Sequence, residues 1–180
     1  GTNLGTVNGH SLAIGAPAYE LMTRTNVAGG ESDITIRFDP TYLQNELYLD
    51  PTPQTRTDTP TDKTDGLSVL LHEIGHALGF TGYYDEASDS FSGNFTTPFD
   101  QRLSISGGVV SFNGPNVQAL YGGIVPLTDN NYTHYGNTNA YPGTSTDPLT
   151  GLMNGVVFYR GWSYAISDLD LAFLAGTGLG

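Results

Sequence analysis

The chain has 180 residues, and its 38% hydrophobic content is enough for one globular domain with a sizeable core. Acidic residues outnumber basic ones 18 to 6, and the net charge of -12 would repel the phosphates of nucleic acids and of anionic lipids, so we expect no nucleic-acid partner. The lack of cysteine excludes disulfides and thiol chemistry, so any metal site must use His, Asp, Glu or carbonyl oxygen.

The composition also bears on where the protein acts. No apolar run reaches the roughly 18 residues that a membrane-spanning helix needs, so we expect no membrane insertion. One lysine beside many Gly, Thr, Asn, Tyr and acidic residues is typical of a secreted bacterial protein, and we expect an extracellular monomer. The Gly-rich residues 1–9 are expected to be the cut edge of a longer precursor.

The first third predicts strands and turns. Residues 33–38, DITIRF, alternate apolar and polar side chains in the manner of a half-buried strand, and residues 46–50, ELYLD, do so more briefly. The intervening DPTYLQN predicts a turn or a short helical bend. Residues 51–65 combine three prolines with many Thr and Asp, which predicts an exposed loop.

The strongest helical pattern covers residues 66–78. Thr64 or Asp65 can cap its N-terminus, and Gly79 can end it. An apolar stripe recurs between them at helical spacing, formed by Leu67, Leu70, Leu71, Ile74 and Leu78. We therefore predict an amphipathic helix here.

A small hairpin and a short helix are predicted next. RLSIS and GVVSF, residues 102–106 and 108–112, are the strands of the hairpin. PNVQALYGG then places Pro115 near the start of a short helix and Gly122 after its end.

Long loops and one more helix complete the chain. Residues 81–100 and 129–155 show no sustained period and predict loops. In ISDLDLAFLAG, Ser167 can cap a helix that ends at Gly176. No repeat or domain boundary is visible, so residues 1–180 are predicted to form a single catalytic domain.

The predicted helix at residues 66–78 carries the sequence HEIGH, in which His72 and His76 stand four residues apart. That spacing puts both imidazoles on one helical face, where they can bind one metal ion. Glu73 is rotated by about 100° from His72, which suits a base that takes a proton from metal-activated water better than a ligand. Because the motif falls inside a capped amphipathic helix, we prefer this interpretation to chance.

A catalytic zinc site needs a third protein ligand and an open position for water. Two histidines remain: His10, in a Gly/Asn-rich segment typical of a solvated loop, and His134, in a loop that could fold back over the helix. Three acidic residues that follow the helix are the alternatives: Asp85, Glu86 and Asp89. We favour His134 on ligand type and predict that these acids belong to a solvated or calcium-binding loop, which makes Ca²⁺ a second candidate ion.

The sequence HEIGHALGF resembles the zinc-binding helix of the metzincin clan of metallopeptidases, whose longer signature is H-E-x-x-H-x-x-G-x-x-H. Gly79 matches the glycine of that signature, whereas Gly82 stands where its third histidine would be. Leishmanolysin-like members bring this histidine from far downstream, and THYG followed by GLMNG is similar to that arrangement. The resemblance covers about residues 33–176 and implies Zn²⁺ as the cofactor.

The resemblance implies an α+β fold in which a small twisted mixed sheet packs on the active-site helix. An irregular C-terminal subdomain would hold a methionine turn and a C-terminal helix. The upper subdomain would span about residues 1–80 and the lower one about residues 81–180. His72, His76 and His134 would bind the zinc, with Met153 in the turn beneath it.

A second position, besides Gly82, differs from the family pattern. Many metzincins carry a tyrosine two residues after the turn methionine, where it helps to hold the oxyanion. Here that position is Gly155. Three other tyrosines are candidates for the same role: Tyr132, Tyr135 and Tyr159.

The function implied is that of a secreted zinc endopeptidase acting on proteins or peptides. Zinc would lower the pKa of water to about 7 and polarise the scissile carbonyl, and Glu73 would act as general base. The substrate is expected to lie extended along an edge strand, with ELYLD as the first candidate, and the excess of acid favours basic substrates.

Two other functions compete with the protease. A catalytically degenerate zinc-binding adhesion or interaction domain would explain the departures at Gly82 and Gly155, but not the intact Glu73. A structural secreted module that holds calcium through its acidic loops fits the composition and leaves the His pair unexplained; its candidate ligands are Asp85, Asp89 and Asp129.

Overall fold

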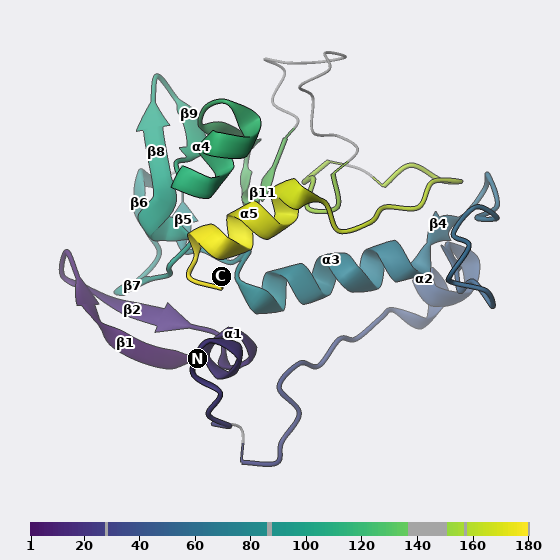
Figure 1. Ribbon diagram of the computed structural model, residues 1–180, viewed down its shortest axis with the longest axis horizontal. Helices are drawn as coiled ribbons and strands as arrows, with labels where there is room; N and C mark the ends of the chain where they lie inside the picture. Colours follow the sequence, from purple (N-terminus) through teal and green to yellow (C-terminus); the bar gives the residue numbers. More distant parts are fainter. Residues whose placement is uncertain (28, 86–87, 137–150, 157, 180) are drawn as a thin grey trace.

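The computed structural model describes residues 1–27, 29–85, 88–136, 151–156 and 158–179. In this part of the chain, small β-sheets lie around one long central helix, and the C-terminal helix lies between that helix and the four-stranded sheet (Figure 1). The architecture is therefore mixed α+β. The division into subdomains at about residue 80 stays a prediction.

The N-terminal residues form a hairpin and a helix that are not predicted from the sequence. The elements are β1 (Thr2–Val7), β2 (His10–Ile14) and α1 (Ala16–Thr23). Asn8 and Gly9 both have positive φ, 51° and 85°, and join the antiparallel pair Val7 and His10. Asn-Gly is the sequence that favours such a two-residue turn, so this is the local signal for the hairpin.

The prediction of a strand at residues 33–38 is wrong, because the structure has no strand there. The side chains of this segment do alternate, with Ile34, Ile36 and Phe38 half-buried and the residues between them exposed. However, no described strand pairs with it, and the segment runs extended along one side of the central helix (Figure 1). The alternation in the sequence indicates which side chains are buried, but a β-strand also needs a hydrogen-bonded neighbouring strand.

The predicted bend is confirmed as α2 (Pro40–Asn45), whose N-terminus the Asp39 side chain caps by accepting from Thr41 N and Tyr42 N at 2.8 and 3.0 Å. The strand predicted at 46–50 is shorter, β3 (Leu47–Tyr48), because only these two residues pair with a neighbouring strand. It pairs in parallel with β4 (Thr64–Asp65), and the loop predicted between them holds no other element. This pairing ties α2 to the start of the next helix.

The central helix α3 (Gly66–Leu78) has the predicted bounds. Asp65 caps it by accepting from Ser68 N at 3.1 Å, and Gly79, with φ 156°, ends it. The Arg56 guanidinium donates to the Asp65 carboxylate at 2.8 Å and to the Tyr164 carbonyl at 2.6 Å. Arg56 thereby fixes the start of α3 to the C-terminal part of the chain.

In the described part of the loop predicted for residues 81–100, which leaves out residues 86–87, the structure has three two-residue strands and the start of a 3-10 helix. They are β5 (Tyr84–Asp85), β6 (Ser90–Phe91), β7 (Phe95–Thr96) and η2 (Asp100–Arg102). β7 adds to the N-terminal hairpin in parallel with β2.

The predicted hairpin, β8 (Leu103–Ser106) and β9 (Val109–Phe112), and the short helix α4 (Pro115–Tyr121) are confirmed. The hairpin continues into a four-stranded sheet of order β11-β10-β9-β8, through β10 (Val125–Thr128) and β11 (Asn131–Tyr135). The loop prediction for residues 129–155 is thus wrong at β11. Residues 137–150 of that prediction lie outside the described residues.

The C-terminal helix α5 (Asp168–Gly176) is confirmed, with Ser167 and Asp170 forming a capping box. Phe173 of this helix is fully buried among other aromatic rings, with centroids 4.3 to 6.2 Å from its own: Phe80, Phe99, Phe112 and Tyr135. Each pair adds to the burial energy. This cluster joins the end of α3, the four-stranded sheet and α5.

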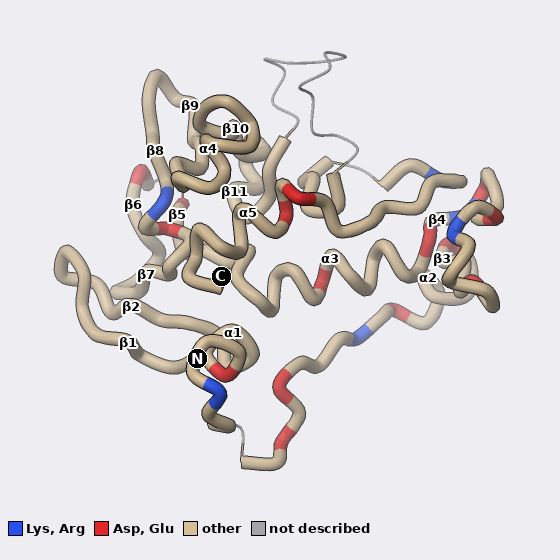
Figure 2. Tube along the Cα trace, in the orientation of Figure 1, with Lys and Arg blue, Asp and Glu red and all other residues tan. Residues whose placement is uncertain are grey.

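Acidic residues lie in the extended segment beside α3, in the loops around β3 and β4 and in α5, whereas the N-terminal hairpin and residues 101–128 carry none (Figure 2). In the described part of the chain, no helix has both the length and the apolar character that crossing a membrane requires.

Candidate metal centre

Three histidines from two elements meet at one point. His72 and His76 project from α3, and His134 projects from β11. The Nε2 atom of His72 lies 3.0 Å from that of His134 and 3.1 Å from that of His76. The structure thus brings together the three histidines that the sequence singles out, in a cluster that could hold a metal ion.

The other ring nitrogen of each histidine faces a backbone carbonyl. His72 Nδ1 lies 2.8 Å from the Leu152 oxygen, His76 Nδ1 2.6 Å from the Phe80 oxygen, and His134 Nδ1 3.3 Å from the Asn131 oxygen. A carbonyl only accepts, so the Nδ1 atoms of His72 and His76 carry the hydrogen and donate it, whereas His134 Nδ1 also lies 3.3 Å from the Thr133 hydroxyl, which can donate or accept. Carbonyl partners of this kind fix the ring orientation of metal-binding histidines.

The Nε2 lone pairs of His72 and His76 therefore face each other, with 3.1 Å between the two nitrogens. Neutral imidazole has one ring hydrogen, and Nδ1 holds it in both residues, so no proton separates these two Nε2 atoms. A cation between them removes this repulsion. Nitrogens bound tetrahedrally to zinc at about 2.0–2.1 Å stand roughly 3.3 Å apart, close to the separations seen, so the residues fit zinc.

Burial favours the neutral imidazoles that a metal requires. Burial lowers the pKa of His72 below its usual value of 6.5. Burial, with His76 and His72 as nearby charges, lowers the pKa of His134 to about 3. Protons therefore compete little with a metal ion for these two rings near neutral pH.

Hydrogen bonds to α5 and to Met153 fix the end of β11, the strand that carries His134. The next residue, Tyr135, is fully buried, and its hydroxyl donates to the Asp170 carboxylate of α5 at 2.6 Å. Its backbone N–H donates to the Met153 carbonyl at 3.1 Å. Burial, together with the Asp170 charge, raises the pKa of Tyr135, so the hydroxyl stays protonated.

Met153 packs against α3 at Gly75, which lies between His72 and His76 in the sequence. Met153 is 1% exposed, and a Cβ added to Gly75 would stand 2.5 Å from its sulfur. The preceding carbonyl, of Leu152, accepts the hydrogen bond from His72. The chain around Met153 therefore contacts α3 beside the histidine pair, and the methionine turn stays a prediction.

At the two positions that differ from the metzincin pattern, Gly82 and Gly155, an added Cβ would clash with neighbouring atoms. A Cβ at Gly82 would stand 2.4 Å from the buried Asp100 carboxylate, which accepts hydrogen bonds from Tyr83 N at 3.0 and 3.1 Å. A Cβ at Gly155 would stand 2.8 Å from His134 Cβ. Neither a histidine at position 82 nor a tyrosine at position 155 fits this arrangement.

Two open cavities meet at Glu73, whose side chain is exposed. The larger, about 690 Å³, lies between α3 and the extended residues 33–39 and reaches His76. The smaller, about 290 Å³, is lined by His72, His134 and Phe158. Both cavities also share Tyr42 and Val69. A cleft therefore passes over the face of α3 that carries the cluster.

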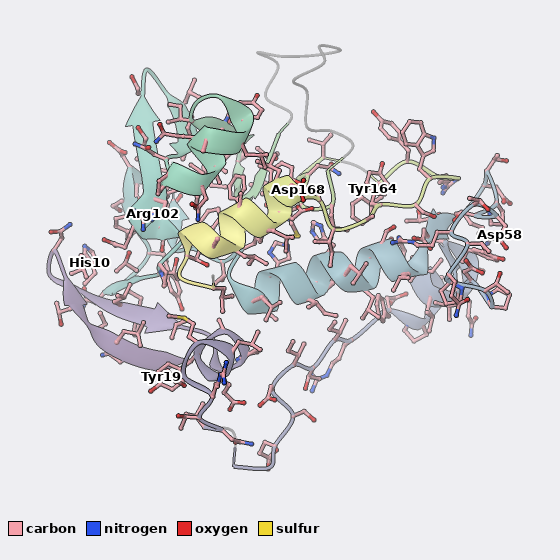
Figure 3. All side chains as sticks on the ribbon, viewed as in Figure 1. His10, Tyr19, Asp58, Arg102, Tyr164 and Asp168 are labelled. Atoms are coloured by element: carbon pink, nitrogen blue, oxygen red, sulfur yellow. The ribbon has the colours of Figure 1, made fainter. Side chains whose placement is uncertain are left out.

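The remaining candidate ligands lie elsewhere. His10 sits on the N-terminal hairpin, far from the middle of α3 (Figure 3), with its ring against Phe91 at 5.5 Å. Asp85 and Asp89 interact with Ser88 and Tyr84, and Glu86 lies outside the described residues. Among the residues described, the His cluster is the one group of three potential ligands, so calcium binding through Asp85, Asp89 or Asp129 stays a prediction.

None of the three tyrosines considered for the oxyanion lines either cavity. Tyr135 is buried against Asp170, Tyr132 packs on Tyr84 with centroids 5.5 Å apart, and Tyr159 packs on Trp162 at 5.7 Å. Tyr42, which does line both cavities, has no motif in the sequence to mark it. Its one local signal is Asp-Pro at residues 39 and 40, which starts a helix.

Comparison with protein-family models, with curated proteins and with solved structures finds no match to this chain.

Proposed function

We propose that the chain is a secreted, monomeric zinc endopeptidase with a metzincin-like site of the leishmanolysin-like arrangement. The observation that carries this proposal is the convergence of three histidine Nε2 atoms beside an exposed glutamate, at the junction of two open cavities. A structural zinc site is closed by four protein ligands, whereas three histidines and an adjacent cleft suit catalysis.

His72, His76 and His134 would hold the zinc, which when bound acts as a Lewis acid that polarises a carbonyl and lowers the pKa of water to about 7. Glu73 accepts the proton of the attacking water as the new C–O bond forms. It then delivers this proton to the amine nitrogen as the C–N bond breaks. Met153 keeps the two helical histidines in place from beneath.

The extended substrate would lie along residues 34–38 and not along ELYLD, the segment that the sequence favours. β3 is paired with β4 and lines neither cavity, whereas residues 34–38 are extended and line the larger cavity opposite Glu73. In the described part of the chain, no backbone hydrogen bond involves residues 34–38. A peptide lying along them would gain main-chain hydrogen bonds, as in other modes of strand addition.

The charges of the cleft support a preference for basic substrates. Asp33, Asp39 and Glu73 line the larger cavity, against the single cation Arg37. The excess of acid would attract a lysine or arginine side chain near the scissile bond.

The test separates the protease from its main rival, a degenerate zinc-binding interaction domain. Purified protein loaded with zinc should cleave casein, and a zinc chelator should abolish cleavage. Glu73→Gln should keep the zinc content and lose about 10²- to 10⁴-fold in rate, the range for general acid–base catalysis. Zinc-loaded wild-type protein that leaves casein intact would favour the rival.

A further inference from the structure

Tyr42 of α2 faces the candidate active site. Its side chain lines the larger cavity with Glu73 and His76, and the smaller cavity with His72 and His134. No other tyrosine in the described part of the chain lines either cavity. The ring therefore stands where the cleft passes over the metal cluster.

The Tyr42 hydroxyl is available as a hydrogen-bond donor. No residue within the described ranges accepts a hydrogen bond from it, and the side chain is 39% exposed. Partial burial and the nearby carboxylates of Glu46 and Glu73 raise the pKa of Tyr42 above 10, so the hydroxyl keeps its proton at neutral pH.

The backbone of Tyr42 is fixed at both ends of α2. At the start, the Asp39 carboxylate accepts from Tyr42 N at 3.0 Å. At the end, Glu46 N donates to the Tyr42 carbonyl at 2.9 Å, and Thr64 N donates to the Glu46 carbonyl at 2.9 Å. The tyrosine is thus tied to the residues that begin α3, and a donor held in advance is what oxyanion stabilisation requires.

We propose that Tyr42 is a catalytic residue that donates a hydrogen bond to the scissile carbonyl oxygen as that oxygen gains negative charge. This role rests on the proposed function, in which the packing at Gly155 leaves no room for a tyrosine after the methionine turn. The attacking water forms the new C–O bond, the carbonyl π electrons move to oxygen, and Glu73 takes the proton. Tyr42 keeps its own proton throughout.

The decisive variant is Tyr42→Phe, which removes the hydroxyl and keeps the ring. With a fluorogenic peptide that the wild type cleaves, kcat should fall about 10- to 100-fold, the range for one charge-assisted hydrogen bond. KM and zinc content should not change. A phosphinic peptide, whose tetrahedral anion resembles the transition state, should bind more weakly by a similar factor, measured by calorimetry. Tyr159→Phe, at the exposed tyrosine against Trp162, is the matched control and should behave as wild type.

Two results would overturn the role of Tyr42 while leaving the protease intact: an unchanged kcat for Tyr42→Phe, or a fall in kcat accompanied by loss of zinc or by unchanged affinity for the phosphinic peptide. If zinc-loaded wild-type protein cleaves no peptide, the proposed function fails and the role of Tyr42 fails with it. The wild-type control therefore tells the two failures apart.

Discussion

Replacing Gly75 by alanine would place a methyl group where the Met153 side chain now packs against α3. The added carbon would lie 2.5 Å from the Met153 sulfur and 3.1 Å from its terminal carbon, and Met153 is 1% exposed. The thioether has no open space to move into, so overpacking should cost about 1–3 kcal/mol. Helix propensity offsets about 1 kcal/mol of this loss, because Gly75 lies inside the helix.

Met153→Ala should cost about 2–5 kcal/mol, because it removes a fully buried side chain. In the double variant, the methyl group at position 75 enters the vacated space, so the clash disappears and the helix gain remains. The double variant should therefore be about 1–3 kcal/mol more stable than the sum of the two single changes predicts.

Urea unfolding followed by circular dichroism measures each free energy, with a chelator present so that zinc binding does not add to stability. Met22→Ala is the matched control, since Met22 is 42% exposed and lies on α1. Combined with Gly75→Ala, this control should give additive effects. Additive effects for Gly75 and Met153 as well would refute the contact between the helix and the methionine.

Two further predictions concern the cap of α3 and the packing around His134. Burial raises the pKa of Asp65, but hydrogen bonds from Ser68 and Arg56 outweigh it and hold this pKa below its usual 3.8. This stabilisation is therefore present above pH 4 and is lost as pH falls through the folded-state pKa. Asp65→Asn should make the free energy of unfolding, measured from pH 2 to 7, fall less steeply toward acid pH. An unchanged slope would contradict this prediction. Gly155→Ala should weaken zinc binding measured by calorimetry, because its Cβ would stand 2.8 Å from His134 Cβ. An affinity equal to that of the wild type would show that β11 can shift without disturbing the zinc site.

The sequence predicts well those features that local physics determines. The bounds of α3 follow from Asp65, Gly79 and an apolar stripe, and those of α5 follow from Ser167 and Gly176. Helix caps and helical periodicity act within a few residues, so they can be recognised without the fold. The His72–His76 pair belongs to the same class, because one turn of helix brings the two rings together.

Features that depend on distant contacts are predicted less well. Residues 33–38 have the alternation of a strand, yet pairing needs a neighbour that the alternation does not specify. β11 forms because β10 pairs with it, which a short Tyr/Thr-rich stretch in a polar segment does not reveal. Tyr42 enters the site through the placement of α2 beside α3, and no local pattern encodes that placement.

Zinc titration of the apoprotein tests the account most directly. Calorimetry should show one zinc bound per wild-type chain. His134→Ala should weaken binding by more than about 100-fold, beyond what is typical for losing only a hydrogen-bond partner of a ligand. His10→Ala, at the histidine of the N-terminal hairpin, should bind zinc as the wild type does. Equal affinity in His134→Ala and wild type, or no zinc binding by the wild type, would contradict the three-histidine site.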